Sequence, residues 1–246
     1  MFGRMQKASI VLCIFMLGSL AGGCASTGAV GDSSENDPYE SFNRKMFALN
    51  DTLDQNVALP AAKAYDHVVP EPARDFVHNG LANLSEPVTF ANDILQGEPT
   101  RALETFGRTL VNSTIGLAGI IDVATPMGLP EHSADFGETL AIYGVGEGPY
   151  LVLPLLGPSN PRDAAGHLID TAFDPLTYVG LREKGLWMAG RQTLGLIDAR
   201  SQNIATLDEL RKSSVDLYAT LRSLYRQHRN AEIHGGKPDL QNLPNI

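Results

Sequence analysis

Residues 37–55 read DPYESFNRKMFALNDTLDQ, and this stretch decides the class of fold. Apolar side chains recur every three or four residues, which places them on one face of a helix. They are Tyr39, Phe42, Met46, Leu49 and Leu53, with a mixed row of Asn43, Phe47, Asn50 and Asp54 beside them. Asp37 followed by Pro38 and Glu40 is typical of a capped helix start. The stretch therefore predicts a strongly amphipathic first helix.

Helical spacing recurs along the rest of the chain. It predicts a helix after Pro99, a third helix from a Ser133 cap to Tyr143, a long helix from Trp187 to Ile204, and another after residues 213–214. Signals for strands are nearly absent, and prolines often precede the helical segments, where a first turn tolerates them. We expect an all-α domain over residues 37–232, made of many short helices joined at angles around one sizeable apolar core.

Residues 144–158, GVGEGPYLVLPLLGP, are the exception. Alternate glycines at Gly144, Gly146 and Gly148 give the backbone unusual freedom, and Pro154 interrupts the apolar run that follows. One interpretation is a hairpin or lid hinged on these glycines, which presents residues 150–153 to an apolar surface. The other is a buried loop that fills the core.

The first 24 residues are typical of a bacterial lipoprotein export signal. A basic start is followed by a short apolar run and by small residues before Cys24, and the apolar run is too short to cross a bilayer. We expect cleavage after residue 23 and acylation of Cys24, which is then the only thiol of the mature chain. Residues 24–36 read as a flexible tether and residues 233–246 as a disordered tail.

Charge and motifs argue against several functions. Cleavage removes two of the 19 basic residues and none of the 28 acidic ones, which leaves a formal charge of −11 and makes nucleic acid an unfavourable partner. Phosphate-loop, G-x-S-x-G and H-E-x-x-H motifs are missing from the sequence. Asp163, Asp170 and Asp174 near His167 are interpreted as helix caps and surface groups. We expect no enzyme activity, no cofactor and no metal.

Two stretches also resemble a known family. Residues 36–44, NDPYESFNR, and residues 136–163, FGETLAIYGVGEGPYLVLPLLGPSNPRD, are similar to the MlaA (VacJ) lipoproteins, and the resemblance runs from about Asn36 to His228. It implies a ring-like assembly of amphipathic helices embedded in the inner leaflet of the outer membrane of a Gram-negative bacterium, with a polar channel. Such proteins remove mislocalised phospholipids from the outer leaflet, work beside trimeric porins, and pass the lipid to the periplasmic carrier MlaC.

The resemblance also assigns roles to residues. Cys24 matches the lipid anchor. The first amphipathic helix matches at Phe42, Asn43, Arg44, Met46, Phe47 and Asn50. The channel-side hairpin matches at Tyr143, Gly144, Gly146, Gly148, Pro149 and Tyr150, and we hypothesise that it gates lipid entry by moving on its glycines.

Two other classes of protein stay open from the residues. One is a lipid-acting hydrolase of the periplasm, which a closed pocket with a Ser or Asp pair would favour. The other is a structural or adhesive lipoprotein without transport activity, which a solid helical core would favour.

Overall fold

The computed structural model describes residues 36–180 and 183–235, and the all-α prediction is confirmed. Cys24, the signal segment, the tether before Asn36 and the tail after Gly235 lie outside the described residues. The helices are α2 (Glu40–Leu53), α3 (Leu59–Val68), α4 (Glu71–Leu95), α5 (Pro99–Thr114), α6 (Phe136–Ile142), α7 (Pro161–Phe173), α8 (Lys184–Gln202), α9 (Ile204–Ser213) and α10 (Leu217–Ile233). A π-helical turn (Asp54–Ala58) joins α2 to α3, and short 3₁₀ turns lie at Thr125–Met127 and Pro175–Thr177.

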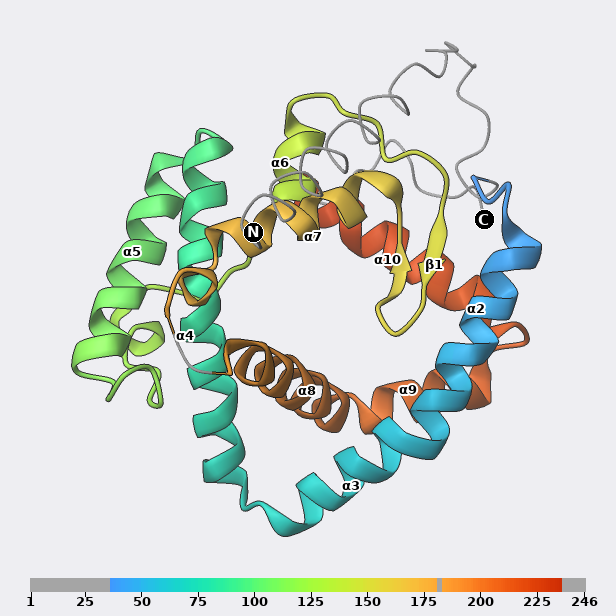
Figure 1. The fold of residues 1–246 in the computed structure, drawn as a ribbon, viewed down its shortest axis with the longest axis horizontal. Coiled ribbons are helices and arrows are strands. Elements are labelled where there is room, and N and C mark those ends of the chain that lie inside the picture. The colour runs from blue at the N-terminus through green and yellow to red at the C-terminus, as the bar shows by residue number, and fades with distance from the viewer. Residues whose placement is uncertain (1–35, 181–182, 236–246) are drawn as a thin grey trace, which may run out of the picture. The chain divides into compact units, whose positions relative to one another are not determined.

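The helices of the folded unit follow one another around a ring (Figure 1). From α2 the chain passes through α3 to α4, and α5 packs on the outer side of α4. The ring continues through α6 and α7 and closes where strand β1 (Leu151–Leu153) packs against α2. The first and the central parts of the chain therefore meet at the closure.

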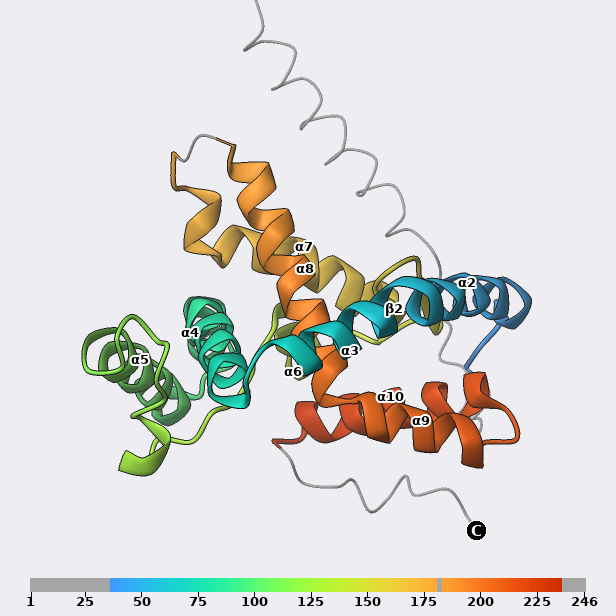
Figure 2. The same ribbon diagram turned by 90° about the horizontal axis from the view of Figure 1, so that it is seen from below.

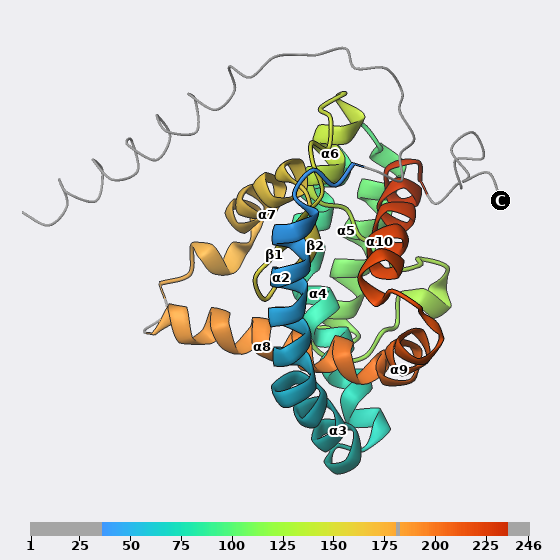
Figure 3. The ribbon, with the colours of Figure 1, turned by 90° about the vertical axis from the view of Figure 1, so that its right-hand side faces the viewer.

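The remaining helices lie at different levels of the ring. α9 and α10 lie on one side of the plane that contains α2 and α3 (Figure 2). The end of α7 and the start of α8 extend to the opposite side, so α8 crosses the ring from one side to the other (Figure 3). Along its course α8 packs against α3, α4 and α9.

Several expected helix boundaries need correction. Asp37 does not cap α2, because its carboxylate accepts hydrogen bonds from buried side chains instead. The cap of α6 is Asp135, whose side chain accepts from the Glu138 N–H, and not Ser133. The long helix predicted near the C-terminus is divided at Asn203 into α8 and α9.

The sequence patterns missed α4, the longest helix of the described residues. It runs for 25 residues with Pro72 in its first turn and Pro87 in its interior. An interior proline removes one backbone hydrogen bond and usually bends or ends a helix. Pro72 and Pro87 therefore favour helix boundaries at positions where α4 continues. Tertiary packing against α5, α7 and α8 overrides that local preference.

Residues 144–158 do form a hairpin. Strand β1 pairs antiparallel with β2 (Gly157–Ser159), with Leu151 opposite Ser159 and Leu153 opposite Gly157. The β1–β2 turn projects from the ring of helices toward its middle (Figure 1). At this turn Leu155 has a left-handed backbone, with a φ of 66°, which is unfavourable for a residue with a β-carbon.

The expectation of a sizeable apolar core is wrong. Few large apolar residues are buried, and the only buried hydrophobic cluster of the described residues consists of Tyr150, Val152 and Tyr218, with Met46, Phe47 and Tyr225 against it. The helices instead bury polar side chains. Examples are Glu86, Asn92 and Asp93 on α4, Thr105, Arg108 and Asn112 on α5, and Asp198 and Arg200 on α8.

Large apolar side chains of the helices are exposed. On α5 the side chains of Leu103, Phe106 and Leu110, predicted to line one side, are 71%, 53% and 54% exposed. Large exposed apolar residues also occur on α2, α4, α7 and α8, among them Phe42, Phe76, Leu168 and Trp187. None of the helices in the described part of the chain combines the length and the apolar character that crossing a bilayer requires. The polarity of the fold is therefore inverted relative to a protein surrounded by water.

Candidate functional site

The first candidate site is the ring closure, where two asparagines of α2 hold the hairpin. Asn43 donates from Nδ2 to the Tyr150 carbonyl at 2.9 Å and accepts the Val152 N–H at 2.9 Å. Asn50 donates to the Leu153 carbonyl at 2.9 Å and accepts the Leu155 N–H at 2.8 Å. Asn43 is fully buried, whereas Asn50 is half-buried. The sequence identified both asparagines but not their partner, which lies more than 100 residues away.

Apolar and charged contacts surround this closure. Met46 and Phe47 pack against the cluster of Tyr150, Val152 and Tyr218, and the Phe47 and Tyr218 rings meet edge to face at 5.7 Å. Arg44 lies on the exposed side of α2, where it pairs with Glu40 and Asp216 and stacks over Tyr218 at 4.4 Å. Phe42 is exposed and does not belong to the buried cluster. The structure therefore brings together five of the predicted residues at the closure, namely Asn43, Met46, Phe47, Asn50 and Tyr150.

The chain just before α2 also joins the closure. The Asn36 carbonyl accepts the Tyr150 N–H at 3.1 Å, and its amide donates to the Gly148 carbonyl at 2.8 Å. Asp37 is buried and accepts from Asn43, Tyr218 and Arg222. Burial opposes its ionisation, but these donors prevail and lower the pKa of Asp37. The folded unit thus begins at Asn36, one residue inside the stretch interpreted as a tether.

The glycine-rich segment before the hairpin is exposed but tied at both ends. Gly144 and Gly148 have φ values of 84° and 73°, whereas Gly146 does not need a left-handed backbone. Tyr143 is 71% exposed and donates its hydroxyl to the Leu95 carbonyl at 2.8 Å. Pro149 lies half-buried between Gly148 and Tyr150. That these residues gate lipid entry stays a prediction.

The hairpin presents other residues than expected. Tyr150 and Val152 are buried in the cluster rather than offered to an apolar surface. The exposed apolar residues are Leu155 and Leu156 at the turn, with 71% and 68% of their surface accessible. The sequence contained a signal for this turn, because a proline within an apolar run, here Pro154, favours a turn at its position.

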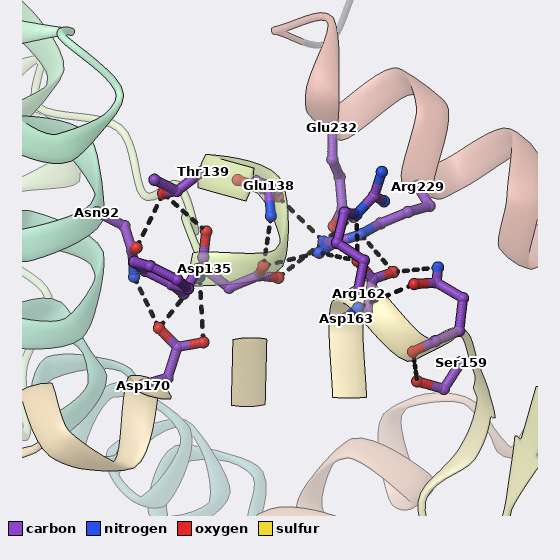
Figure 4. A network of polar contacts seen from close by, with 12 residues as sticks. Asn92, Asp135, Glu138, Thr139, Ser159, Arg162, Asp163, Asp170, Arg229 and Glu232 are labelled. Atoms are coloured by element: carbon purple, nitrogen blue, oxygen red, sulfur yellow. Dashed lines mark hydrogen bonds and ion pairs between the residues drawn. The ribbon is translucent and has the colours of Figure 1, made fainter. Parts of the chain in front are cut away.

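A second candidate site is a buried network of charges that joins α6, α7 and α10 (Figure 4). Arg229 of α10 contacts both carboxylate oxygens of Asp135 at 2.7 Å and both of Asp163 at 3.0 and 3.1 Å. Glu138 and Glu232 lie at 3.3 and 3.0 Å from the same guanidinium. One arginine therefore organises four carboxylates, and sequence patterns identified neither it nor the network.

The acidic side chains of this network differ in the direction of their pKa shifts. Burial opposes the ionisation of Asp135 and Asp163, but hydrogen bonds from Arg229 outweigh it and lower both pKa values. For Glu138, burial dominates, the charge of Asp135 adds to it, and the attraction of Arg229 is smaller, so that the pKa rises to about 7. Glu138 is therefore the member of the network that takes up a proton near neutral pH.

Replacing Glu138 by glutamine is expected to stabilise the fold selectively at high pH. Because the folded-state pKa of Glu138 lies above its value of 4.5 in an unfolded chain, ionisation reduces stability as the pH rises from about 4.5 through 7. Glu138→Gln removes that charge, so it should change little at pH 5 and stabilise by about 1–3 kcal/mol at pH 8. Denaturant unfolding at both pH values measures this, and equal effects at the two pH values would contradict it.

The aspartates near His167 serve structural contacts. The expectation of a cap or surface group is wrong for Asp163, because the cap of α7 is Asn160, which accepts the Asp163 N–H, and the buried Asp163 carboxylate accepts from Asn160 and Arg229. Asp170 accepts from Asn92 and from the Phe136 N–H. Asp174 accepts the Leu176 N–H and pairs with Arg191 at 2.6 Å. Across residues 36–180 and 183–235, no three His, Cys, Asp or Glu side chains form a group that could hold a metal ion.

Comparisons with known proteins show which family this chain is similar to. The family model described as MlaA lipoprotein matches residues 35–232. The intermembrane phospholipid transport system lipoprotein MlaA of Haemophilus influenzae is 35% identical over 242 residues, which cover 94% of this chain and 93% of that protein. The protein of the same name from Escherichia coli is 36% identical over 229 residues, covering 91% and 88%.

A solved structure shares the fold. It is reported as the structural basis for maintenance of bacterial outer membrane lipid asymmetry, and its chain is 36% identical, with a TM-score of 0.72. The match covers 80% of this chain and 98% of that one. With the family model spanning the described helices and these relatives covering nearly the whole chain, the protein belongs to the MlaA lipoprotein family.

Proposed function

We propose that this protein is the lipoprotein of an intermembrane phospholipid transport system that maintains the lipid asymmetry of the outer membrane. It removes mislocalised phospholipids from the outer leaflet and provides their passage toward the periplasm. The relatives from H. influenzae and E. coli are described as lipoproteins of an intermembrane phospholipid transport system, and the similar solved structure concerns the maintenance of outer membrane lipid asymmetry.

The inverted polarity of the helices is the observation that carries the proposal. Exposed leucine, isoleucine and phenylalanine side chains on α4, α5 and α8 are unfavourable in water, at about 25 cal/mol for each Å² of apolar surface. Acyl chains remove that cost. Helices that do not combine the length and the apolar character of a bilayer span, and that carry exposed apolar side chains, suit a ring that lies in one leaflet.

A polar path for the lipid head group is the second part of the proposal. A phospholipid that leaves one leaflet must move its charged head group along a polar path while its tails stay in an apolar phase. Buried asparagine and arginine side chains bond to carboxylates of neighbouring helices, and these bonds hold together the ring that would surround such a path. Irregular backbone such as residues 144–150 is tolerated at membrane depth where protein or water satisfies its polar groups.

Location and partners complete the proposal. Acylated Cys24 anchors the chain in the periplasmic leaflet of the outer membrane and delivers the ring there. The ring works beside a trimeric porin, and the periplasmic carrier MlaC receives the lipid. These partners follow from the family resemblance of residues 36–44 and 136–163.

Deleting the gene and measuring outer-leaflet phospholipid tests the function. We expect surface phospholipid to rise in the deletion strain and to return to the original level with the wild-type gene. A Cys24→Ala variant should rescue only in part, because it weakens membrane localisation more than it harms a ring already inserted. Unchanged surface phospholipid after deletion would exclude transport and favour a structural lipoprotein.

A further inference from the structure

Asp198 of α8 differs from the other buried carboxylates of the described residues in its ion-pair partner. All the others pair with an arginine, and they are Asp37, Glu86, Asp93, Glu138 and Asp163. The ion pair of Asp198 in this part of the chain is with His78 of α4, whose Nδ1 lies 3.0 Å from Oδ2. A buried charge is costly unless it is paired, so Asp198 depends on an imidazole where the other acids have a permanent cation.

Two arginines in the neighbourhood of Asp198 are already paired with other acids. Arg200, two residues further along α8, binds both carboxylate oxygens of Asp54 at 2.7 and 3.1 Å. Arg74, in the first turn of α4, pairs with Asp66. Neither guanidinium is therefore available to compensate the charge of Asp198.

The remaining contacts of Asp198 are neutral hydrogen-bond donors. The Tyr65 hydroxyl of α3 donates at 3.4 Å, and the Gln202 amide donates at 3.0 Å. Hydrogen bonds of this kind stabilise a carboxylate but leave its charge in place. Burial and, after it, the negative charge of Asp198 raise the pKa of Tyr65, which is the effect expected of a neighbouring acid that stays ionised.

Asp198 also fixes the orientation of the His78 imidazole. A carboxylate only accepts hydrogen bonds, so the imidazole donates to it from Nδ1, and a neutral ring then keeps its lone pair at Nε2. Among residues 36–180 and 183–235, Nε2 of His78 makes no hydrogen bond, and the side chain is 45% exposed. The exposed Gln202 amide lies 3.0 Å from the same ring and adds its carbonyl oxygen as a second acceptor.

These acceptors lie on the side of α4 that contacts α8. The helix α8 packs against α4 and α3 and lies inside the ring (Figure 1). Phe76, two residues before His78, is 46% exposed, and an α-helix turns by about 200° over two residues. The exposed phenylalanine and the histidine therefore lie on opposite faces of α4.

A primary ammonium group has the chemistry that these features require. It supplies the positive charge that a neutral imidazole does not give Asp198, and its three N–H donors suit His78 Nε2 and the Gln202 carbonyl. An anionic group at the same place would meet the Asp198 carboxylate, and like charges at short distance repel. A phospholipid head group that ends in ethanolamine carries such an ammonium, whereas a glycerol head group has no positive charge beside its phosphate.

We propose that His78, backed by Asp198, binds the ammonium of an ethanolamine phospholipid and gives the protein a preference for this head group. The place of this binding in lipid passage rests on the proposed function. The binding site itself rests on the contacts of His78, Asp198 and Gln202.

Lipid retention by the purified full-length lipoprotein tests the site. The protein is placed at pH 8 in nanodiscs with equal amounts of phosphatidylethanolamine and phosphatidylglycerol, and native mass spectrometry measures the ratio of the two lipids that stay bound on release. We expect the wild type to retain several-fold more phosphatidylethanolamine. In His78→Arg the guanidinium compensates Asp198 itself, so the protein should keep its melting temperature while the ratio falls to one or below.

His67→Arg is the matched control, because it makes the same change at an exposed histidine of α3 and should keep the wild-type ratio. Asp198→Asn should lose the preference as well, since it removes the negative charge behind the imidazole. Thermal unfolding verifies that each variant is folded. Equal ratios in the wild type and His78→Arg, a wild type enriched in phosphatidylglycerol, or an unchanged preference in folded Asp198→Asn would overturn the proposal.

The head-group site and the proposed function fail in distinguishable ways. If gene deletion raises surface phospholipid but the purified wild type retains both lipids equally, the proposed function stands and the site is refuted. If deletion leaves surface phospholipid unchanged, the proposed function fails. The retention ratio of the purified protein decides the site in both cases.

Discussion

Replacing Arg229 by alanine is expected to destabilise the folded protein by about 3–5 kcal/mol, the cost of breaking a buried ion pair from one side. The Arg229 side chain is 9% exposed, and its bonds to Asp135 and Asp163 connect α10 to the starts of α6 and α7. Without the guanidinium, four carboxylates stay in one partly buried cluster, in which Arg162 still pairs with Asp163 at 3.0 Å. A loss of this size is a large part of the stability of an ordinary domain.

Urea unfolding of the purified protein in mild detergent measures the effect of Arg229→Ala. Arg226→Ala on the same helix is the control, because Arg226 pairs only with Glu147 in a partly exposed contact and should cost less than about 1 kcal/mol. The pH dependence adds a second criterion. Asp135 and Asp163 owe their lowered pKa values to Arg229, so they stabilise the wild type above the unfolded-state pKa of 3.8 and lose this effect as the pH falls.

The difference in free energy of unfolding between the wild type and Arg229→Ala should therefore be larger at pH 8 than at pH 4. In the variant, both aspartates regain higher pKa values and can be protonated as the pH falls, which removes the uncompensated charge. Equal stability losses in Arg229→Ala and Arg226→Ala would show that the network is not a centre of stability.

Gly166→Ala is expected to have the second largest effect, a loss of about 2–3 kcal/mol or more. A β-carbon on Gly166 would lie 2.4 Å from the Gly137 nitrogen and 2.8 Å from its α-carbon, so α6 and α7 touch through their backbones. A backbone cannot move aside as a flexible side chain does. The methyl group would push α6 away from α7 and pull Asp135 and Glu138 out of the Arg229 network.

Gly190→Ala in α8 is the matched control for Gly166→Ala. Both glycines lie within helices, but a β-carbon at Gly190 meets no atom within 4 Å. Alanine there should stabilise by up to about 1 kcal/mol, since it lowers the entropy lost on folding. Thermal unfolding of both variants checks the pair, and a Gly166→Ala variant as stable as Gly190→Ala would contradict close contact of the two helices.

Much of the helical structure was predictable, because helix periodicity is local. The pattern from Tyr39 to Leu53 located α2, and the pattern from Leu103 to Leu110 located α5. Local patterns could not show which face of each helix is buried. On α5 the buried side chains are Ala102, Thr105, Arg108 and Asn112, whereas the row of large apolar side chains is exposed. In a water-soluble domain a helix with the same spacing would bury its apolar row and expose its polar side chains.

The candidate site was predictable in part. The resemblance to the family pointed to Asn43, Asn50 and Tyr150, and the structure brings them together. The pairing of asparagine amides with the hairpin backbone could not be inferred, since it needs the helix and the strand to run side by side at matching rises. Arg229 belongs to a locally basic C-terminal segment, a pattern that predicts a solvated helix face. That prediction is wrong for Arg229, whose side chain is 9% exposed.

By itself, the sequence determined where helices form and which side chains share a face, because these depend on neighbours within about four residues. Only the tertiary structure decided that the polar faces are buried and that asparagines of α2 bind the backbone of the hairpin. Those outcomes depend on partners far along the chain, such as Asn43 with Val152 and Arg229 with Asp135, which are 109 and 94 residues apart. Charged and amide groups leave water only where such partners satisfy them, and no local pattern encodes that pairing.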